Sequence, residues 1–299
     1  MSRSVRSAGL SGVVEVQRQE PPLPKGGGFD DLAYRDRGHD RLYDEAEEIE
    51  DEAPDANEVV QGLLGDCWLM STLSAAVRAD GGPARVKNMI TAVDGGYDVR
   101  FFERSQDGTW VVGPPVFVTW TFPVRADGSL AFGFGQAAGG TVLWPAIIEK
   151  AYAAKHGGYD RINSGLIDDP NLPPVAEPAG GWRVAARPAA EIAMEAIMGR
   201  PATSSSSTAL DEAGTKDKIV SHVGGGLPVV VASDNHWVSV VRATDREIEV
   251  RDQRELPANR RKTLDWETFF VRFGSNAVFL ENAPAEDVPF EPWNEGVAY

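Results

Sequence analysis

The sequence predicts an α+β protein, because helical periodicity dominates its first part and strand-like alternation dominates its last part. Two apolar helical runs, at residues 67–79 and 144–155, lie in the first part. Runs rich in β-branched residues fill the last part, at residues 228–232, 237–243, 247–252 and 276–280. Between the two parts, residues 168–187 are dense in proline and glycine, which indicates a boundary.

The elements of the first part follow one another with clear punctuation. The helix predicted over residues 67–79 comes directly after Asp66, a residue type that commonly caps helix N-termini. Strand-like alternation follows at Tyr97–Glu103 and Trp110–Thr121, separated by the turn signal Asp107-Gly108.

The second part begins with helical patterns before its strands. Ala189–Met198 has helical spacing, and Leu210–Val223 is helix-like until it meets three consecutive glycines at residues 224–226. The strand-like runs listed above come after these glycines, so the second part is expected to be rich in β-structure.

Composition and punctuation divide the chain into four expected segments. They are a flexible acidic N-terminal leader at 1–56, a first lobe at 57–175, a second lobe at 176–285 and a C-terminal tail at 286–299. Asp30–Glu58 holds 13 acidic residues against three arginines, so much of the net charge of −16 is N-terminal. Whether the leader inhibits the protein or only solubilises it is left open.

The same composition excludes several classes of protein. The strong negative charge disfavours nucleic acid as a partner, because phosphate binding needs a clustered basic face. The first ten residues lack the layout of a signal peptide, and no window is apolar enough to cross a membrane. We therefore expect a cytoplasmic protein, or one exported without a cleavable signal peptide. The sequence gives no indication of the oligomeric state.

The only cysteine, Cys67, lies in the octapeptide QGLLGDCW at residues 61–68, immediately before an apolar helical run. Thiolate is the nucleophilic form of cysteine, and a helix N-terminus favours it through its dipole and free N–H groups. Gln61 can turn its amide toward an oxyanion that forms at the attacked carbon. A lone cysteine is commonly a small buried hydrophobe, but this setting favours a nucleophile.

This octapeptide and the following residues 69–76 resemble the nucleophile segment of the calpain family of papain-like cysteine proteases. Residues 143–159, LWPAIIEKAYAAKHGGY, are similar to the helix that packs behind the active-site cleft in that family. Residues 226–232 and 236–241 resemble the paired strands that carry the family's histidine. The resemblance extends over about residues 54–280 and is most specific at the cysteine.

The resemblance implies a papain-like core of two lobes, a helical lobe with the cysteine and a β-rich lobe with the histidine. It also implies a cysteine-type endopeptidase, a thiol protease that hydrolyses peptide bonds of a protein or peptide substrate. High usage of Ala, Gly, Arg and Pro in a short chain is typical of a bacterial member of such a family.

The expected general base is His236, one of four histidines. His39 lies in the acidic leader, His156 follows a helix end, and His222 closes a helix before three glycines. Only His236 opens a strong strand. At its family-like distance from Cys67, it would draw the thiol proton and later protonate the leaving amine.

The group that orients the imidazole departs from the family pattern, in which an Arg-Asn-Pro-Trp-Gly stretch supplies an asparagine. The corresponding strand here reads RDQR at residues 251–254, and the turn at 244–246 brings Asp252 roughly opposite His236. A carboxylate can accept the imidazole N–H and raise the pKa of the ring. The Pro-Trp-Gly residues are missing, and Asn259, in an expected loop, is the alternative orienting residue.

Two other function classes stay open at the level of sequence. A transglutaminase-like acyl transferase uses a Cys-His-Asp trio, although the octapeptide argues against that reading. A non-catalytic calpain-like binding module is the second alternative, because the tryptophan expected after Asp252 is missing.

No cofactor is expected to be required. Animal calpains respond to calcium, but the chain has no Asp-x-Asp-x-Asp-Gly loop of the EF-hand type, so calcium dependence is left open. Clustered cysteine and histidine ligands for zinc are also missing.

Overall fold

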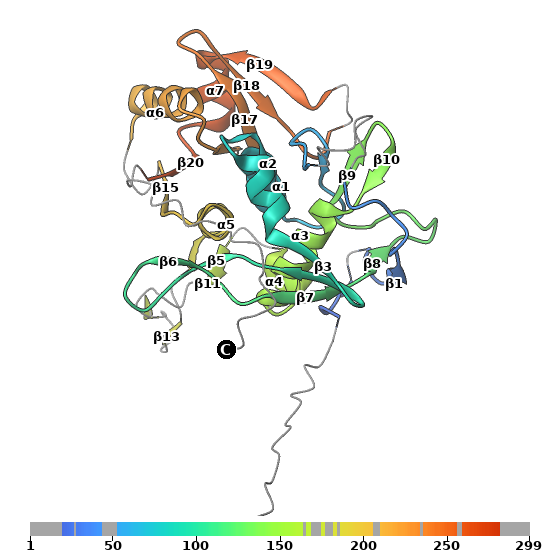
Figure 1. Cartoon of the computed structure of the whole chain (residues 1–299). Helices are drawn as coiled ribbons and strands as arrows, with labels where there is room; N and C mark the ends of the chain where they lie inside the picture. Colours follow the sequence, from blue (N-terminus) through green and yellow to red (C-terminus); the bar gives the residue numbers. More distant parts are fainter. Residues whose placement is uncertain are drawn as a thin grey trace, which may run out of the picture.

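The computed structural model describes residues 20–26, 28–43, 53–163, 166–168, 175–176, 182–183, 186–205, 210–233, 236–255 and 259–281 (Figure 1). Its helix and sheet content is mixed, which confirms the α+β prediction. The helices of the predicted first part and the strands of the last part lie where the sequence patterns place them.

A six-stranded antiparallel sheet carries the histidine side of the candidate site. Its order is β15-β20-β16-β17-β18-β19. In that order the strands are Ala202–Ser204, Ala277–Leu280, Val229–Ser233, His236–Ala243, Glu247–Arg251 and Arg261–Asp265. Register pairs Ser233 with His236 and Ser239 with Arg251, so the start of β17 and the end of β18 meet at one end of the sheet.

Helices cover both faces of this sheet (Figure 1). One face packs against α6 (Glu212–Gly224) and α7 (Trp266–Phe273), and the other face packs against α1 (Cys67–Arg78). Strand alternation explains the division, because Val229 and Val231 join the cluster under α6 and α7 whereas Val230 joins the cluster around α1.

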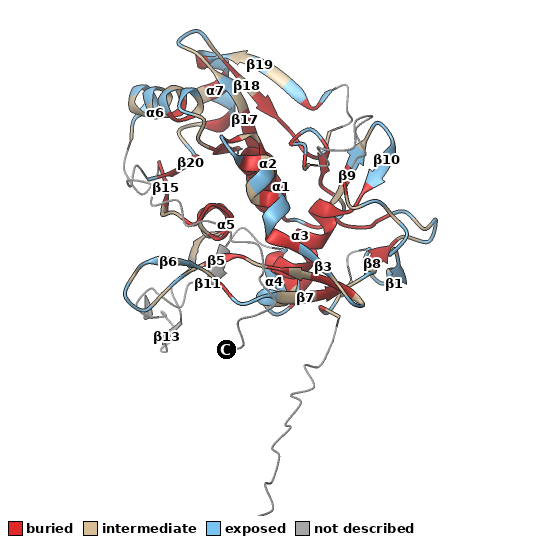
Figure 2. Cartoon of the chain, viewed as in Figure 1, coloured by how far each residue is buried: buried red, intermediate tan, exposed pale blue. Residues whose placement is uncertain are grey.

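Helix α1 is the centre of the larger hydrophobic cluster. All of its residues from Cys67 to Val77 are buried, which Figure 2 shows as a mostly red helix. It packs against α2 (Gly82–Met89), α3 (Trp144–Lys155) and α5 (Ala189–Met198). Because the helix is enclosed on all sides, its first residue is held rigidly against the sheet.

The other elements are short and surround this cluster. Helix α4 is Tyr159–Ile162. The remaining strands form small antiparallel sheets. Two of these have three strands, in the orders β10 (Gly140–Val142), β9 (Phe134–Ala137), β2 (Val59–Val60) and β3 (Ile90–Val93), β4 (Gly96–Val99), β7 (Val116–Thr119). The others are pairs: β1 (Ala33–Asp36) with β8 (Thr121–Val124), β5 (Phe102–Arg104) with β6 (Trp110–Val112), β11 (Leu166–Asp168) with β14 (Ala186–Pro188), and β12 (Val175–Ala176) with β13 (Trp182–Arg183).

The segment that starts at Glu20 docks on the larger cluster. Glu20 forms an ion pair with the fully buried ammonium of Lys150 at 2.5 Å, and it accepts a hydrogen bond from the Thr121 hydroxyl at 2.5 Å. The hydroxyl of Tyr34 donates to the carbonyl of Pro21 at 2.6 Å. A buried cation thus has its acidic partner in the N-terminal segment.

Residues 20–26 and 28–43 of the expected leader over residues 1–56 thus make defined contacts with the rest of the structure. The many charges in this stretch indicated a solvated tail, but some of them have partners, such as Arg37 with Asp40. Residues 1–19, 27 and 44–52 of the expected leader, and the whole expected tail at 286–299, lie outside the described residues.

The expected boundary at residue 175 does not separate the two hydrophobic clusters. Helix α5 follows that boundary, yet its apolar residues belong to the cluster around α1. The reason is that α5 is apolar on several sides and packs against α1. The sheet face that holds the second cluster is already covered by α6 and α7.

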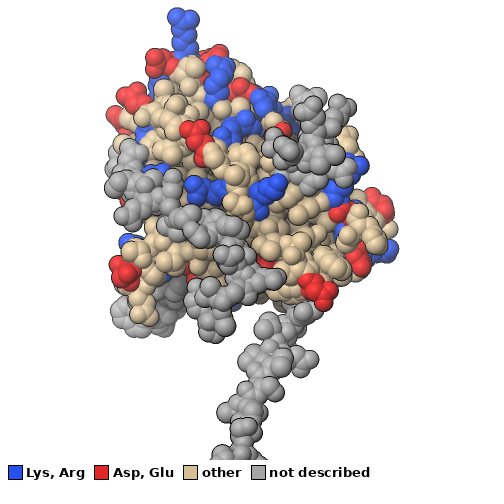
Figure 3. Space-filling model, in the orientation of Figure 1, with Lys and Arg blue, Asp and Glu red and all other residues tan. Residues whose placement is uncertain are grey.

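The surface of the described residues is mixed in charge. On the face seen in Figure 3, Lys and Arg lie across the upper and central part, whereas Asp and Glu gather more toward the margins. Within the described residues, every helix is too short or too polar to traverse a bilayer.

Candidate active site

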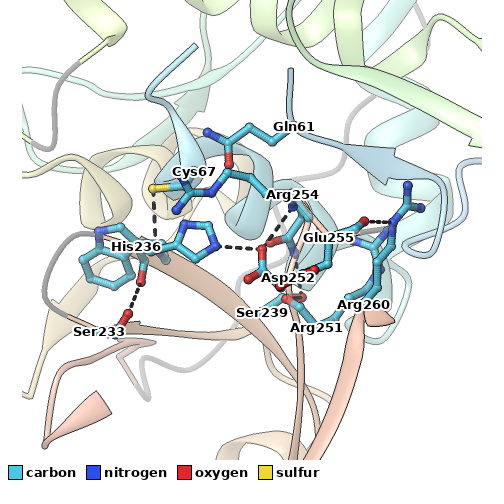
Figure 4. Close-up of polar contacts among 12 residues, drawn as sticks. Gln61, Cys67, Ser233, His236, Ser239, Arg251, Asp252, Arg254, Glu255 and Arg260 are labelled. Carbon is cyan, nitrogen blue, oxygen red and sulfur yellow. Dashed lines mark hydrogen bonds and ion pairs between the residues drawn. The ribbon is translucent and has the colours of Figure 1, made fainter. Parts of the chain in front are cut away.

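Cys67 is the first residue of α1, so its thiol lies at the positive end of a 12-residue helix. The residue is 8% exposed, and its Sγ accepts a hydrogen bond from the backbone N–H of Trp237 at 3.5 Å. Because Trp237 follows His236 in β17, this contact joins the cysteine helix to the histidine strand (Figure 4).

The imidazole of His236 stands between the thiol and a carboxylate (Figure 4). Its Nε2 lies 2.7 Å from Oδ1 of Asp252, and the backbone N–H of Arg254 donates to the same oxygen at 3.0 Å. Its Nδ1 is buried and faces the side chain of Cys67. The two side chains of the pair are only 13% and 11% exposed, so the pair is largely shielded from water.

The pKa shifts of this pair reinforce each other. Burial alone would lower the pKa of His236, but the hydrogen bond to Asp252 and the neighbouring Cys67 raise it above its usual value. Burial would raise the pKa of Asp252, but the hydrogen bonds from His236 and from Arg254 lower it. Both shifts favour an imidazolium next to a carboxylate.

Gln61 lies buried in the segment before the nucleophile and is tied to the histidine side. Its backbone N–H donates to the carbonyl of Gln253 at 3.0 Å, and its Nε2 donates to the carbonyl of Leu64 at 2.7 Å. A carbonyl can only accept, so this contact fixes which end of the amide is the donor. Its Oε1 is buried without a hydrogen-bond partner, and the side chain lies near Cys67 in Figure 4.

Asp66 does not cap α1 in the expected way. Its position is that of the N-cap and its carbonyl accepts from the N–H groups of Leu69 and Met70, but its carboxylate makes no capping hydrogen bond. The carboxylate is fully buried and contacts Glu149 of α3 instead. A local capping pattern could not reveal this contact, because the partner lies far along the chain.

Arg251, the residue before Asp252, binds the cysteine segment to the histidine hairpin. Its buried guanidinium donates to the carbonyls of Asn57 at 2.6 Å and Val59 at 2.7 Å. Gln253 donates to the Ser239 hydroxyl at 2.9 Å in the same interface. These contacts hold both sides of the candidate site in one relative position.

Several arginines converge on Asn57, and this affects the charge of Arg251. Burial, together with repulsion from Arg260, Arg78 and Arg261, lowers the pKa of Arg251 to about 9. Sequence reasoning missed Arg251, because the alternation of β18 assigns it to the solvent-facing side, where Glu247 and Glu249 lie. The segment around Asn57 covers that side of β18 at its last residue, so Arg251 is buried there.

The alternative residues lie elsewhere. Asn259 is exposed just before β19, and the imidazole of His236 is bonded to Asp252 instead. His222 has both ring nitrogens 2.9 Å from backbone carbonyls, and His156 stacks on Tyr152 with its pKa lowered to about 4, mainly by burial. His39 is exposed. Within the described residues, no three His, Cys, Asp or Glu side chains form a group that could hold a metal ion.

Comparison with known proteins agrees with this geometry around the cysteine. Residues 38–171 match the sequence profile of calpain family cysteine proteases. This part of the chain is therefore similar to the calpain family. The matched residues include Gln61 and Cys67 and end before His236, so the histidine side of the candidate site rests on its own geometry.

Curated relatives are similar over part of the chain. The calpain-type cysteine protease DEK1 of Arabidopsis thaliana is 34% identical over 121 residues, which cover 38% of this chain and 5% of the relative. The calpain-1 catalytic subunit of Macaca fascicularis is 31% identical over 168 residues, 53% of this chain and 22% of the relative, and the human subunit is 30% identical over the same coverage. The chain thus spans only about a fifth or less of the length of these relatives.

Proposed function

We propose that this protein is a cysteine endopeptidase that hydrolyses peptide bonds through Cys67, His236 and Asp252. The observation that carries the proposal is the imidazole of His236, bonded to Asp252 at 2.7 Å through Nε2 and facing Cys67 through Nδ1. A nucleophile, a base and an orienting group in this order are the parts that acyl transfer needs.

In the proposed mechanism, Nδ1 of His236 takes the thiol proton, and the Cys67 thiolate attacks the scissile carbonyl carbon. The first N–H groups of α1 and the free amide N–H of Gln61 stabilise the oxyanion. His236 then protonates the leaving amine, and the thioester on Cys67 is released by water that His236 activates. Asp252 keeps Nε2 protonated and stabilises the imidazolium.

We further propose that the core has the papain-like two-lobed layout. Support comes from the two hydrophobic clusters, with the apolar residues of α1 in one and those of the inner strands β16 to β18 largely in the other. The cysteine and the histidine come from elements on either side of the interface that Arg251 bridges.

We also propose a protein or peptide as substrate, acted on in a reducing compartment such as the cytoplasm. A lone cysteine that must stay a free thiol to act as nucleophile fits such surroundings.

The test is peptide mapping of a protein mixture digested with the wild-type protein and with Cys67→Ala. New peptide termini should appear only with the wild type, while both proteins should melt at similar temperatures because the volume change is small. Equal cleavage by Cys67→Ala would refute a thiol mechanism. Incorporation of an amine probe into proteins without new peptide termini would instead favour the acyl transferase.

A further inference from the structure

Gln253 follows Asp252 in the turn after β18 and is 0% exposed. Its backbone carbonyl accepts the N–H of Gln61 at 3.0 Å, and its side-chain Nε2 donates to the Ser239 hydroxyl of β17 at 2.9 Å. The next residue, Arg254, donates its backbone N–H to the Asp252 carboxylate at 3.0 Å. One buried residue therefore holds the proposed oxyanion group and lies inside the turn that carries the group orienting the base.

The side chain of Gln253 begins a chain of buried hydrogen bonds whose direction is fixed. The chain ends at the backbone carbonyl of Ala56, which can only accept, so the Ser74 hydroxyl donates its single proton there at 3.0 Å. The Ser239 hydroxyl donates in turn to the oxygen of Ser74 at 3.3 Å. Ser239 has then used its only proton, so it can only accept from Gln253. The amide of Gln253 must therefore present Nε2, and not Oε1, to this hydroxyl.

This chain of hydrogen bonds crosses the interface between the two sides of the candidate site. It runs from Gln253 at the end of the hairpin, through β17 and α1, to Ala56 in the segment before the nucleophile. Its two serines lie on the strand that begins with His236 and on the helix that begins with Cys67. Both serines are fully buried, and burial strengthens hydrogen bonds of this kind. The position of Gln253 is thus tied to the elements that carry the base and the nucleophile.

One polar atom of Gln253 lowers the stability of the fold instead of raising it. Its Oε1 is buried and has no hydrogen-bond partner among the described residues. A buried acceptor without a partner costs free energy. Methionine has a similar length and no amide, so Gln253→Met removes this cost together with the hydrogen bond to Ser239. The effects of Gln253 on stability and on catalysis can therefore be separated.

We propose that Gln253 is a positioning residue: its amide anchors the turn that carries Asp252, and its carbonyl holds Gln61, so one residue sets the base and the oxyanion group relative to each other. The proposal rests on the proposed function, since it assigns Gln253 a role toward His236 and Gln61. Gln253 touches no reacting atom and acts through these groups. Catalytic groups keep a productive geometry only when the residues that support them are themselves fixed.

The test compares Gln253→Met, which has no amide, with Gln253→Glu, which has a carboxylate of the same shape. Gln106→Met is the matched control, because Gln106 is exposed in the turn between β5 and β6. We would measure the melting temperature, kcat and KM for a fluorogenic peptide, and the rate of Cys67 alkylation by iodoacetamide as a function of pH. Alkylation reports the thiolate and does not require peptide cleavage.

Gln253→Met should lower kcat by about tenfold or more with KM nearly unchanged, because a displaced group loses its effect in the transition state. Its melting temperature should stay close to that of the wild type. Its alkylation should require a higher pH, because a displaced Asp252 stabilises the imidazolium of His236 less. Gln253→Glu should not restore kcat at neutral pH, since a carboxylate cannot donate to Ser239. Gln106→Met should match the wild type in every measurement.

Double variants test whether Gln253 acts through both groups. Combined with Asp252→Asn, and separately with Gln61→Ala, Gln253→Met should cause a smaller further loss of kcat than it causes alone. Ser239→Ala removes the same hydrogen bond from the other side, so it should lower kcat similarly and replaces Gln253→Met if that variant does not fold. Wild-type kcat in either folded variant, wild-type kcat in Gln253→Glu, or losses that add fully in both double variants would each overturn the proposal.

The two proposals fail in different ways. If the folded wild type cleaves no peptide, the proposed function fails, while the pH dependence of alkylation in the wild type and in Gln253→Met still decides whether Gln253 positions the pair of His236 and Asp252. If the wild type cleaves peptides and the folded Gln253→Met protein cleaves them equally fast, the proposed function stands and the positioning role of Gln253 is refuted.

Discussion

Gly62→Ala should displace Gln61 and thereby reduce catalysis more than it reduces stability. The backbone of Gly62 runs so close to the neighbouring segment that an added Cβ would lie 2.3 Å from the carbonyl oxygen of Phe132 and 2.4 Å from that of Ala131. Both obstacles are backbone atoms, so a side chain cannot simply rotate away. The next residue, Leu63, is bonded to the same carbonyl of Ala131 at 2.8 Å.

The magnitude follows from the distance that must be gained. Ordinary contact begins near 3.4 Å, so the chain at Gly62 has to move by about 1.1 Å from 2.3 Å. A displacement of about 1 Å of a group that acts in the transition state can reduce the rate roughly 100-fold. Overpacking of this kind destabilises a protein by about 1–3 kcal/mol.

The assay is kcat/KM for a fluorogenic peptide, with melting temperatures measured in parallel. Gly224→Ala is the matched control, because nothing lies within 4 Å of the position that its Cβ would take. A double variant tests the cause: if Gly62→Ala acts by moving Gln61, adding it to Gln61→Ala should cause little further loss. Wild-type kcat/KM in a folded Gly62→Ala protein would refute the reasoning, as would full additivity with Gln61→Ala.

Three further predictions concern the hairpin that carries the base. Asp252→Ala should reduce kcat by orders of magnitude with little change in KM, whereas Asp252→Asn should keep much more activity. Asn259→Ala should have almost no effect on steady-state kinetics. The reverse ranking would make Asn259 the orienting residue. Because the pKa of His236 is raised, its stabilising effect is present below its usual value of 6.5 and is lost as the pH rises through the raised value. Asp252→Asn should therefore lower the melting temperature more at pH 5 than at pH 9, and an equal loss at both would contradict the ion pair. Arg251→Met removes a buried donor from the carbonyl of Val59, so it should lower the free energy of unfolding, measured in urea, by about 1–3 kcal/mol. Unchanged stability would show that relief of repulsion among the arginines offsets the lost hydrogen bond.

The helices that sequence patterns predicted best are those whose burial depends on their own composition. Helices α3 and α5 begin and end at the residues that the patterns indicate, Trp144–Lys155 and Ala189–Met198. Both are rich in alanine and apolar residues, and proline or glycine lies close to each end. Local chemistry is sufficient to define such elements.

Strand prediction was weaker where alternation is interrupted. The run expected over Tyr97–Glu103 is two strands, β4 and β5, with a break at Arg100 and Phe101. Both Phe101 and Phe102 are buried, so consecutive residues face the core and the chain has to turn between them. A pattern of period two cannot show such a turn.

Contacts within the candidate site also differ in whether the sequence could predict them. The contact between His236 and Asp252 is local to one hairpin, so counting residues through the turn was enough to expect it. Asp66 with Glu149, and Arg251 with Asn57, are contacts between segments far apart in the sequence. In the sequence, Asp66, Glu149 and Arg251 each resemble an ordinary surface charge, and only the fold brings each of them to its partner.

The ion pair of Glu20 with Lys150 bears on where this protein can be shortened. Similarity to the calpain family begins at residue 38, and a fragment cut at that point would lack both Glu20 and β1. The ammonium of Lys150 would then lose its carboxylate, and the edge of β8 that faces β1 would be left unpaired. The N-terminal segment before the matched residues thus supplies the carboxylate that neutralises a buried cation within them.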